Sequence, residues 1–181
     1  SFYQIEFTGP INLASFMEDN LDVVIIIPTN EADDNVPEDF HAYVKELSNI
    51  LYPNAKIIND TDALKMDLGN CIIKAFGTMD GNLWLSKYKD SFPFRIEDDK
   101  IIADKTYEGT GLKFITAMPN PQNYKNPLII YTAQEAKDII NITNIFHGPA
   151  DFDVIKNNEV IYSGYYRKDK EKWTFQDENG G

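Results

Sequence analysis

The chain has 181 residues, of which 43% are hydrophobic and 25% are charged, as in an ordinary globular protein. This length predicts one domain over residues 1–181, with a core over about 20–167 and irregular ends. The 17 basic and 29 acidic residues give a net charge of −12, which argues against nucleic-acid partners because both surfaces are negative.

Short apolar, β-branched runs predict strands, and apolar residues at helical spacing predict helices between them. In chain order we expect a strand over Leu21–Thr29, a helix from Pro37 to Tyr52, a strand over Ala55–Ile58, a helix over Asp62–Leu68, a strand over Cys71–Phe76, a helix over Gly81–Asp90, a hairpin over Phe94–Ala103, strands over Leu112–Ala117 and Leu128–Tyr131, a helix over Thr132–Ile140, and a hairpin over Asp153–Tyr166.

Local signals set several of these boundaries. Pro119-Asn120-Pro121 is expected to stop the strand before it, because proline donates no backbone hydrogen bond. Thr132, with Glu135 three residues later, has the spacing of a helix N-cap with its capping box. Tyr107–Gly111 reads as a loop, and the polar tail after Trp173 as frayed.

The alternation of strands and helices predicts the fold class. We expect a three-layer α/β domain with a mostly parallel sheet, helices on both faces and β-hairpin insertions. The longest apolar run, Val23–Pro28, is too short to cross a bilayer, so no membrane span is expected.

In such a sheet, ligands bind beyond the carboxyl ends of the strands. Four loops therefore become candidates: Pro28–Asp34, Gly77–Gly81, Met118–Asn123 and His147–Asp151. Within them we take Asn30, Gly77, Thr78 and Asn120 as candidate binding residues. No glycine-rich phosphate loop is present, and no motif for a metal or a cofactor is found, so we expect neither.

A catalytic reading rests on His147, with Asp151 as the carboxylate that would orient its imidazole. The alternative is structural, with His147 bonded to a loop carbonyl. No serine lies in a Gly-x-Ser-x-Gly motif. The single cysteine, Cys71, begins a buried strand and cannot form an internal disulfide. These patterns favour a protein that is not an enzyme.

The stretch Cys71–Pro121 resembles an accessory domain attached to secreted bacterial hydrolases, namely esterases and prolyl-oligopeptidase-like α/β-hydrolases. The resemblance rests on the motifs Phe76-Gly77-Thr78, Phe92-Pro93-Phe94, the hairpin Arg95–Ala103, Tyr107-x-Gly109 and Pro119-Asn120-Pro121. In that family a glycine-bearing strand follows the last motif, whereas here Leu128–Tyr131 leads into Thr132.

The resemblance and the first residue, Ser1, imply a fragment of a larger, exported bacterial protein. We therefore expect a non-catalytic accessory or binding module, with a neighbouring catalytic domain as partner. An extracellular or cell-envelope location follows, and a cytoplasmic one stays open. The alternatives are a small stand-alone hydrolase that uses His147 and Asp151, or a sensor of small ligands.

Overall fold

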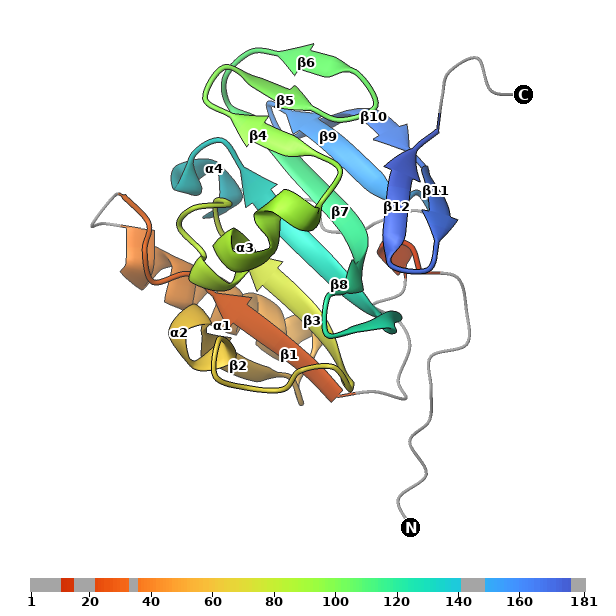
Figure 1. Cartoon of the computed structure of the whole chain (residues 1–181). Coiled ribbons are helices and arrows are strands. Elements are labelled where there is room, and N and C mark those ends of the chain that lie inside the picture. The colour runs from red at the N-terminus through yellow and green to blue at the C-terminus, as the bar shows by residue number, and fades with distance from the viewer. Residues whose placement is uncertain (1–10, 15–21, 33–35, 141–148, 177–181) are drawn as a thin grey trace.

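The computed structural model describes residues 11–14, 22–32, 36–140 and 149–176 (Figure 1). Strands outweigh helices, 44% to 23%. The strands are β1 Asp22–Ile27, β2 Lys56–Asn59, β3 Cys71–Phe76, β4 Arg95–Glu97, β5 Lys100–Ile102, β6 Thr106–Glu108, β7 Leu112–Asn120, β8 Asn123–Ala133, β9 Phe152–Lys156, β10 Glu159–Gly164, β11 Tyr166–Asp169 and β12 Lys172–Phe175. The helices are α1 Val36–Leu51, α2 Asp60–Ala63, α3 Leu83–Tyr88 and α4 Ala136–Ile140, with a 3₁₀ turn over Lys89–Ser91.

One large mixed sheet forms the centre of the fold. Its seven strands run in the order β10-β9-β7-β8-β3-β1-β2. The pairs β2–β1, β1–β3 and β3–β8 are parallel, whereas β8–β7, β7–β9 and β9–β10 are antiparallel. The sheet therefore has a parallel half and an antiparallel half that meet at β8.

The expected three-layer α/β class is wrong. The fold is mostly β, with two small antiparallel sheets, β4-β5-β6 and β11-β12, beside the mixed sheet. Only α1 is longer than two turns among the helices described here. The β-hairpins were expected as insertions on a sheet with helices on both faces. They instead make up much of the structure, and the β9–β10 hairpin is part of the main sheet.

The parallel half follows the sequence closely. Strand β3 has the predicted bounds, and β1, β2 and α1 agree to within a few residues. The burial of β1 and β3 explains this agreement, because strands buried on both faces have continuous apolar sequences. Helix α2 is shorter than predicted and starts at Asp60. The Asp60 side chain accepts hydrogen bonds from the N–H groups of Thr29 and Leu83.

The β7–β8 hairpin is the largest error. Pro119 does not stop β7; it lies in the strand opposite Pro127, where the register shifts and neither residue has an N–H to contribute. The chain then turns through Pro121 and Gln122, and the Asn120 side chain accepts a hydrogen bond from the Gln122 N–H at 2.9 Å. A tight turn of this kind makes the two strands antiparallel neighbours.

Thr132 is not a helix cap. It lies in β8, paired with Phe114 and fully buried. Helix α4 begins four residues later, at Ala136. The strand continues through Thr132 because its β-branched side chain fits the interior of a sheet. Tyr107, expected in a loop, lies in β6, and Trp173 lies in β12.

Aromatic side chains cover the antiparallel half of the sheet. The ring of Phe114 on β7 packs against Phe94 at 4.8 Å and Phe152 at 5.6 Å between centroids. Phe152 in turn contacts Tyr166 at 5.3 Å, and Tyr166 contacts Trp173 at 5.5 Å. The β11–β12 hairpin therefore takes the place of a helix here, because these broad rings bury the area that a helix face would otherwise cover.

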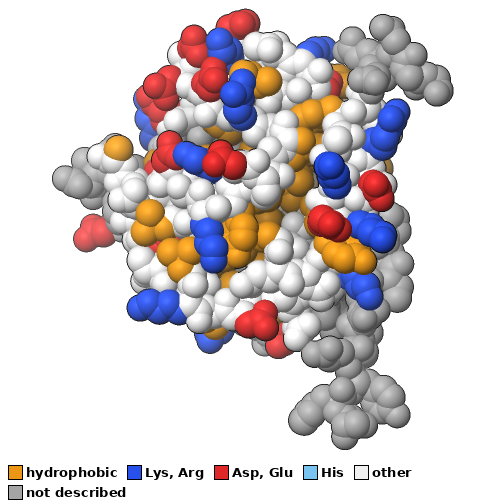
Figure 2. Space-filling model, viewed as in Figure 1, with side chains coloured by type: hydrophobic (Ala, Val, Ile, Leu, Met, Phe, Trp, Pro, Cys, Tyr) orange, Lys and Arg blue, Asp and Glu red, His pale blue; other side chains and the backbone are white. Residues whose placement is uncertain are grey.

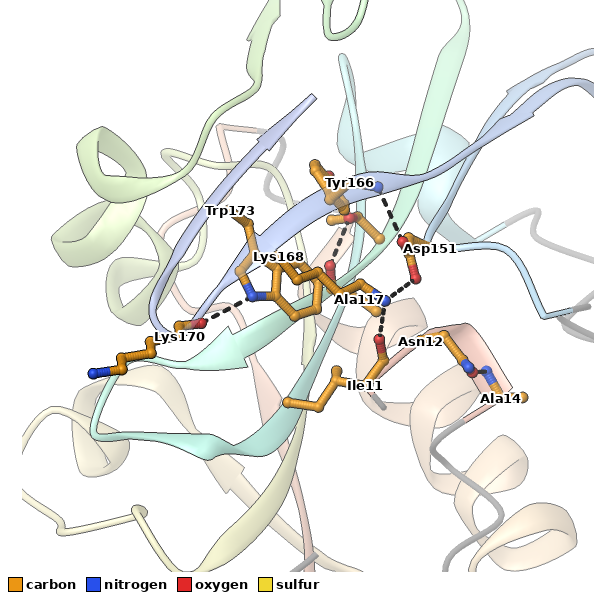
Figure 3. A network of polar contacts seen from close by, with 10 residues as sticks. Ile11, Asn12, Ala14, Ala117, Asp151, Tyr166, Lys168, Lys170 and Trp173 are labelled. Atoms are coloured by element: carbon orange, nitrogen blue, oxygen red, sulfur yellow. Dashed lines mark hydrogen bonds and ion pairs between the residues drawn. The ribbon is translucent and has the colours of Figure 1, made fainter. Parts of the chain in front are cut away.

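A polar network fixes this hairpin to the body (Figure 3). The carboxylate of Asp151, which is 1% exposed, accepts from the Tyr166 N–H at 3.0 Å and pairs with the Lys168 ammonium at 2.7 Å. Lys168 also donates to the Ile11 carbonyl at 2.6 Å and lies over the Trp173 ring at 4.9 Å. The ammonium thus joins the segment at residues 11–14 to β11, although they are far apart in sequence.

This network predicts coupled stability effects. Lys168→Met leaves the Asp151 carboxylate buried without its cation and should lower the free energy of unfolding by about 1–3 kcal/mol. Asp151→Asn should cost a similar amount, and the double variant less than the two together by about 1 kcal/mol. Urea unfolding measures all three.

The exposed pair Lys89–Asp80 is the control, because its two side chains are 43% and 82% exposed. The same cycle with Lys89→Met and Asp80→Asn should show much weaker coupling. Equal coupling in the two cycles would contradict the role given to Asp151.

Candidate functional site

A pocket of about 710 Å³ opens at the carboxyl ends of three neighbouring parallel strands. The loops after β1, β3 and β8 form its walls. It is lined by Asn30, Glu31, Ala32, Thr78, Asp80, Gly81, Gln134, Glu135, Ala136 and Lys137. This is the place where open sheets with parallel strands bind ligands.

Glu31 is the central polar group of the pocket. One carboxylate oxygen accepts from the Thr78 N–H at 2.8 Å, and the other accepts from the Thr78 hydroxyl at 2.7 Å. The Thr78 hydroxyl oxygen also accepts from the Gly81 N–H at 2.9 Å. These bonds join the loop after β1 to the loop after β3 and hold the carboxylate in one position.

Two glycines leave room for that carboxylate. A Cβ at position 81 would lie 2.1 Å from Glu31, and one at position 77 would lie 3.0 Å from it. Gly77 also has φ +134°, a conformation that other residues rarely adopt. The glycine at each of these two positions therefore follows from the placement of Glu31.

Two fully buried polar side chains, Asp60 and Asn82, hold the same loops from the interior of the protein. The Asp60 carboxylate accepts from the N–H groups of Thr29 at 3.1 Å and Leu83 at 2.7 Å. The Asn82 side chain caps α3 by accepting from Trp84 and Leu85 N–H groups, and it donates to the Phe76 carbonyl at 2.9 Å. The loops at the pocket are therefore preorganised by buried hydrogen bonds.

Burial raises the pKa of Glu31, and the nearby carboxylates of Asp60 and Asp80 act in the same direction. The two hydrogen bonds from Thr78 oppose this, because they favour the ionised form. A carboxyl group with a raised pKa inside a cleft is typical of ligand-binding and catalytic sites.

The remaining charges lie at the rim of the pocket and are paired. Asp80 pairs with Lys89 at 2.7 Å, and Glu135 with Lys137 at 3.0 Å. The side chain of Gln134 is used by the scaffold, since it bonds to the Leu112 N–H and the Gly109 carbonyl. Acceptor groups therefore predominate on the pocket wall.

Three of the four predicted binding residues meet here. Asn30 and Thr78 line the pocket, and Gly77 lies directly below it beside Glu31. Sequence reasoning missed Glu31 itself, although it follows Asn30 in the candidate loop after β1. Two features of the sequence could have pointed to Glu31. It is a carboxylate next to a predicted binding residue, and its loop faces a loop that contains glycines.

Asn120 lies elsewhere. Its side-chain amide donates to the carbonyls of Leu68 at 2.8 Å and Cys71 at 3.3 Å, near the amino end of β3. The opposite end of the parallel strands holds the pocket described above. These bonds fasten the β7–β8 turn to the loop before β3, and Asn120 lines a separate pocket of about 480 Å³ there.

The structure describes one member of the predicted catalytic pair, Asp151. Asp151 is occupied by Lys168 and the Tyr166 N–H, as described above. His147 lies outside the described residues. Within the ranges that the structure describes, no group of three His, Cys, Asp or Glu side chains is placed to hold a metal ion.

Comparison of the sequence with known protein families and curated proteins finds no relative of this chain. No family model matches the chain, and no curated protein matches it. None of the helices that the structure describes is both long enough and apolar enough to cross a membrane.

The raised pKa of Glu31 predicts a pH-dependent effect of its substitution. In the unfolded chain the pKa of the Glu31 carboxyl group is near 4.5. In the folded protein the pKa is higher, so the group keeps its proton at pH values where the unfolded chain has lost it. The contribution of Glu31 to the free energy of unfolding therefore increases as the pH falls through the folded-state pKa, and it decreases as the pH rises through that pKa.

We expect the unfolding free energy of the wild type, relative to Glu31→Gln, to increase as the pH falls from about 7 to the unfolded-state pKa of 4.5. Chemical unfolding of both proteins at the two pH values measures this difference. Asp98→Asn, at an exposed carboxylate in the β4–β5 turn, is the control. If the difference in unfolding free energy between wild type and Glu31→Gln stayed constant, or fell as the pH fell, burial would not raise the pKa of Glu31.

Proposed function

We propose that this chain is a non-catalytic binding module of an exported bacterial protein that acts with a hydrolase, and that the pocket around Glu31 takes a small polar ligand. The single observation that carries the binding site is the convergence of three strand-end loops on one clamped carboxylate. The link to a hydrolase rests on the resemblance of Cys71–Pro121 alone.

Preorganisation supports a binding role. The hydrogen bonds of Glu31, Asp60 and Asn82 hold the pocket loops without help from a ligand. A ligand that enters such a pocket does not have to order the loops, so less of its binding energy is lost.

The pocket wall favours ligands that donate hydrogen bonds. Glu31, Asp80 and Glu135 offer carboxylate oxygens, and Asn30 adds a side-chain amide. A polyhydroxylated molecule or a small amine can donate to such groups. Anions are disfavoured, because three carboxylates and one lysine, Lys137, line the pocket of a protein whose net charge is already −12.

The stand-alone hydrolase is the weaker alternative. It needs the Asp151 carboxylate free to orient His147, but Asp151 is buried and bonded to Lys168 and Tyr166. The sensor hypothesis uses the same pocket as the binding module and differs only in what the ligand does to a partner. The acidic surface further supports a module without nucleic-acid partners.

Two variants test the site by different routes. Glu31→Gln removes the charge and keeps the shape of the side chain, whereas Gly81→Ala keeps the charge and displaces the carboxylate, since the added Cβ would lie 2.1 Å from it. Probes are a monosaccharide (glucose), a diamine (1,4-diaminobutane) and inorganic phosphate, each titrated into the ¹⁵N-labelled chain and followed by amide NMR.

We expect glucose or the diamine, and not phosphate, to shift the amide signals of residues 30–32, 78–81 and 134–137. Both variants should weaken that binding by about tenfold. Asp153→Asn is the matched control, because Asp153 is also a buried carboxylate with a raised pKa but bonds to Ser163, away from the pocket. Shifts confined to other regions, or equal weakening by the control, would overturn the assignment.

A further inference from the structure

The Glu31 carboxylate has no positively charged partner in the described part of the chain. Its two hydrogen bonds come from Thr78, one from the N–H group and one from the hydroxyl group. A carboxylate can accept about four hydrogen bonds, so about two acceptor positions are left. Because Glu31 lines the pocket of about 710 Å³, a ligand inside the pocket can approach this carboxylate.

The other acids on the pocket wall are compensated by lysines. Asp80 pairs with Lys89 at 2.7 Å, and Glu135 pairs with Lys137 at 3.0 Å, and the side chains of both pairs are exposed. Several acidic side chains on the face in Figure 2 likewise lie next to basic ones. Among the described lining residues, this leaves Glu31 as the carboxylate whose charge has no counterpart.

The surroundings of Glu31 are unfavourable to its negative charge. Burial raises its pKa, and so do the charges of Asp60 at the start of α2 and Asp80 in the loop after β3. Both opposing effects come from the hydrogen bonds with Thr78. The cost of taking this carboxylate out of water already arises on folding, so a bound cation loses only its own hydration when it pairs with Glu31.

We propose that the ligand of this pocket is an organic cation whose ammonium group binds the Glu31 carboxylate. The proposal rests on the binding function proposed above and narrows its ligands from hydrogen-bond donors in general to amines. An ammonium group supplies three N–H donors and the compensating charge, whereas a hydroxyl group supplies one donor and no charge. The net charge of −12 also attracts cations to the protein as a whole.

Binding of a cation to Glu31 is linked to the release of a proton. A bound ammonium group favours the ionised form of Glu31 and so lowers the pKa of this carboxyl group. The affinity for the amine therefore rises as the pH rises through the pKa of Glu31 in the free protein, which lies above 4.5. The amine itself stays charged over this range, because the pKa of an alkylamine is about 10.

The neighbouring charges do not replace Glu31 in this role. Asp60 is buried, and its carboxylate is bonded to backbone N–H groups. Asp80, Glu135 and Lys137 are exposed and paired, so their charges are compensated and screened by water. The selectivity for a cation and its dependence on pH should therefore both follow Glu31.

Two ligands of the same chain length test the requirement for charge. 4-Amino-1-butanol and the neutral 1,4-butanediol are titrated into the ¹⁵N-labelled full chain at pH 7 and followed by amide NMR. We expect the amine to shift the signals of residues 30–32, 78–81 and 134–137 and to bind about tenfold more tightly than the diol. Both ligands meet the wild-type protein, so this comparison does not depend on the folding of a variant.

Two variants locate the charge that selects the amine. Glu31→Gln should remove the preference for the amine over the diol. Glu171→Gln is the matched control, because it makes the same substitution at an exposed carboxylate of the separate pocket of about 480 Å³, and it should keep the preference. Circular dichroism establishes that both variants are folded.

Titrations at pH 7 and pH 5 test the linkage to the proton. The affinity of the wild type for the amine should fall severalfold at the lower pH, because more of Glu31 is then protonated. The affinity for the diol, and that of Glu31→Gln for the amine, should change much less.

The outcomes separate this proposal from the one on which it rests. If the diol or glucose shifts the pocket amides and the amine binds no more tightly, the cation is wrong and the binding module stands. An amine affinity that does not change with pH, or a preference lost equally in Glu171→Gln, would overturn the role of Glu31. If none of the ligands shifts the pocket amides, both proposals are wrong.

Discussion

The fully buried side chain of Asn82 holds together the part of the molecule on which the site depends. It caps α3, bonds to the end of β3, and lies beside Asp60, which bonds to the chain just after β1 and to the first residue of α3. Burying a polar group is costly unless the group is hydrogen-bonded, so these bonds favour one arrangement of the loops that they join. Glu31 extends that arrangement to the surface, where it meets Thr78.

The mixed topology of the sheet brings the third wall to this site. Because β8 is parallel to β3, its carboxyl end lies at the same edge as those of β1 and β3 and delivers residues 134–137 to the pocket. Because β8 is antiparallel to β7, the other end of the hairpin lies far from the pocket, at the amino end of β3. The reversal at β8 thus separates Asn30 and Thr78 from Asn120.

The sequence predicts the parallel half well and the antiparallel half poorly, for a physical reason. Strands such as β3 are buried on both faces, and their apolar runs are unmistakable. By contrast, Pro119 and Thr132 carry local signals for a strand end and a helix cap, and tertiary pairing within β7 and β8 overrides both. Loop positions in the sequence pointed to Asn30, Gly77 and Thr78, which the fold brings to or beside one pocket. The contact of Glu31 with Thr78 joins residues 47 positions apart and has no local signature.

The central claim is that buried side chains hold the pocket loops rigid in the absence of a ligand. Amide hydrogen exchange tests it directly at Thr78, Leu83 and Leu85, whose N–H groups donate to Glu31, Asp60 and Asn82 respectively. We expect these three amides to exchange about as slowly as the core amides of β3. Exchange as fast as that of an open loop would contradict it, because the pocket would then not be preformed.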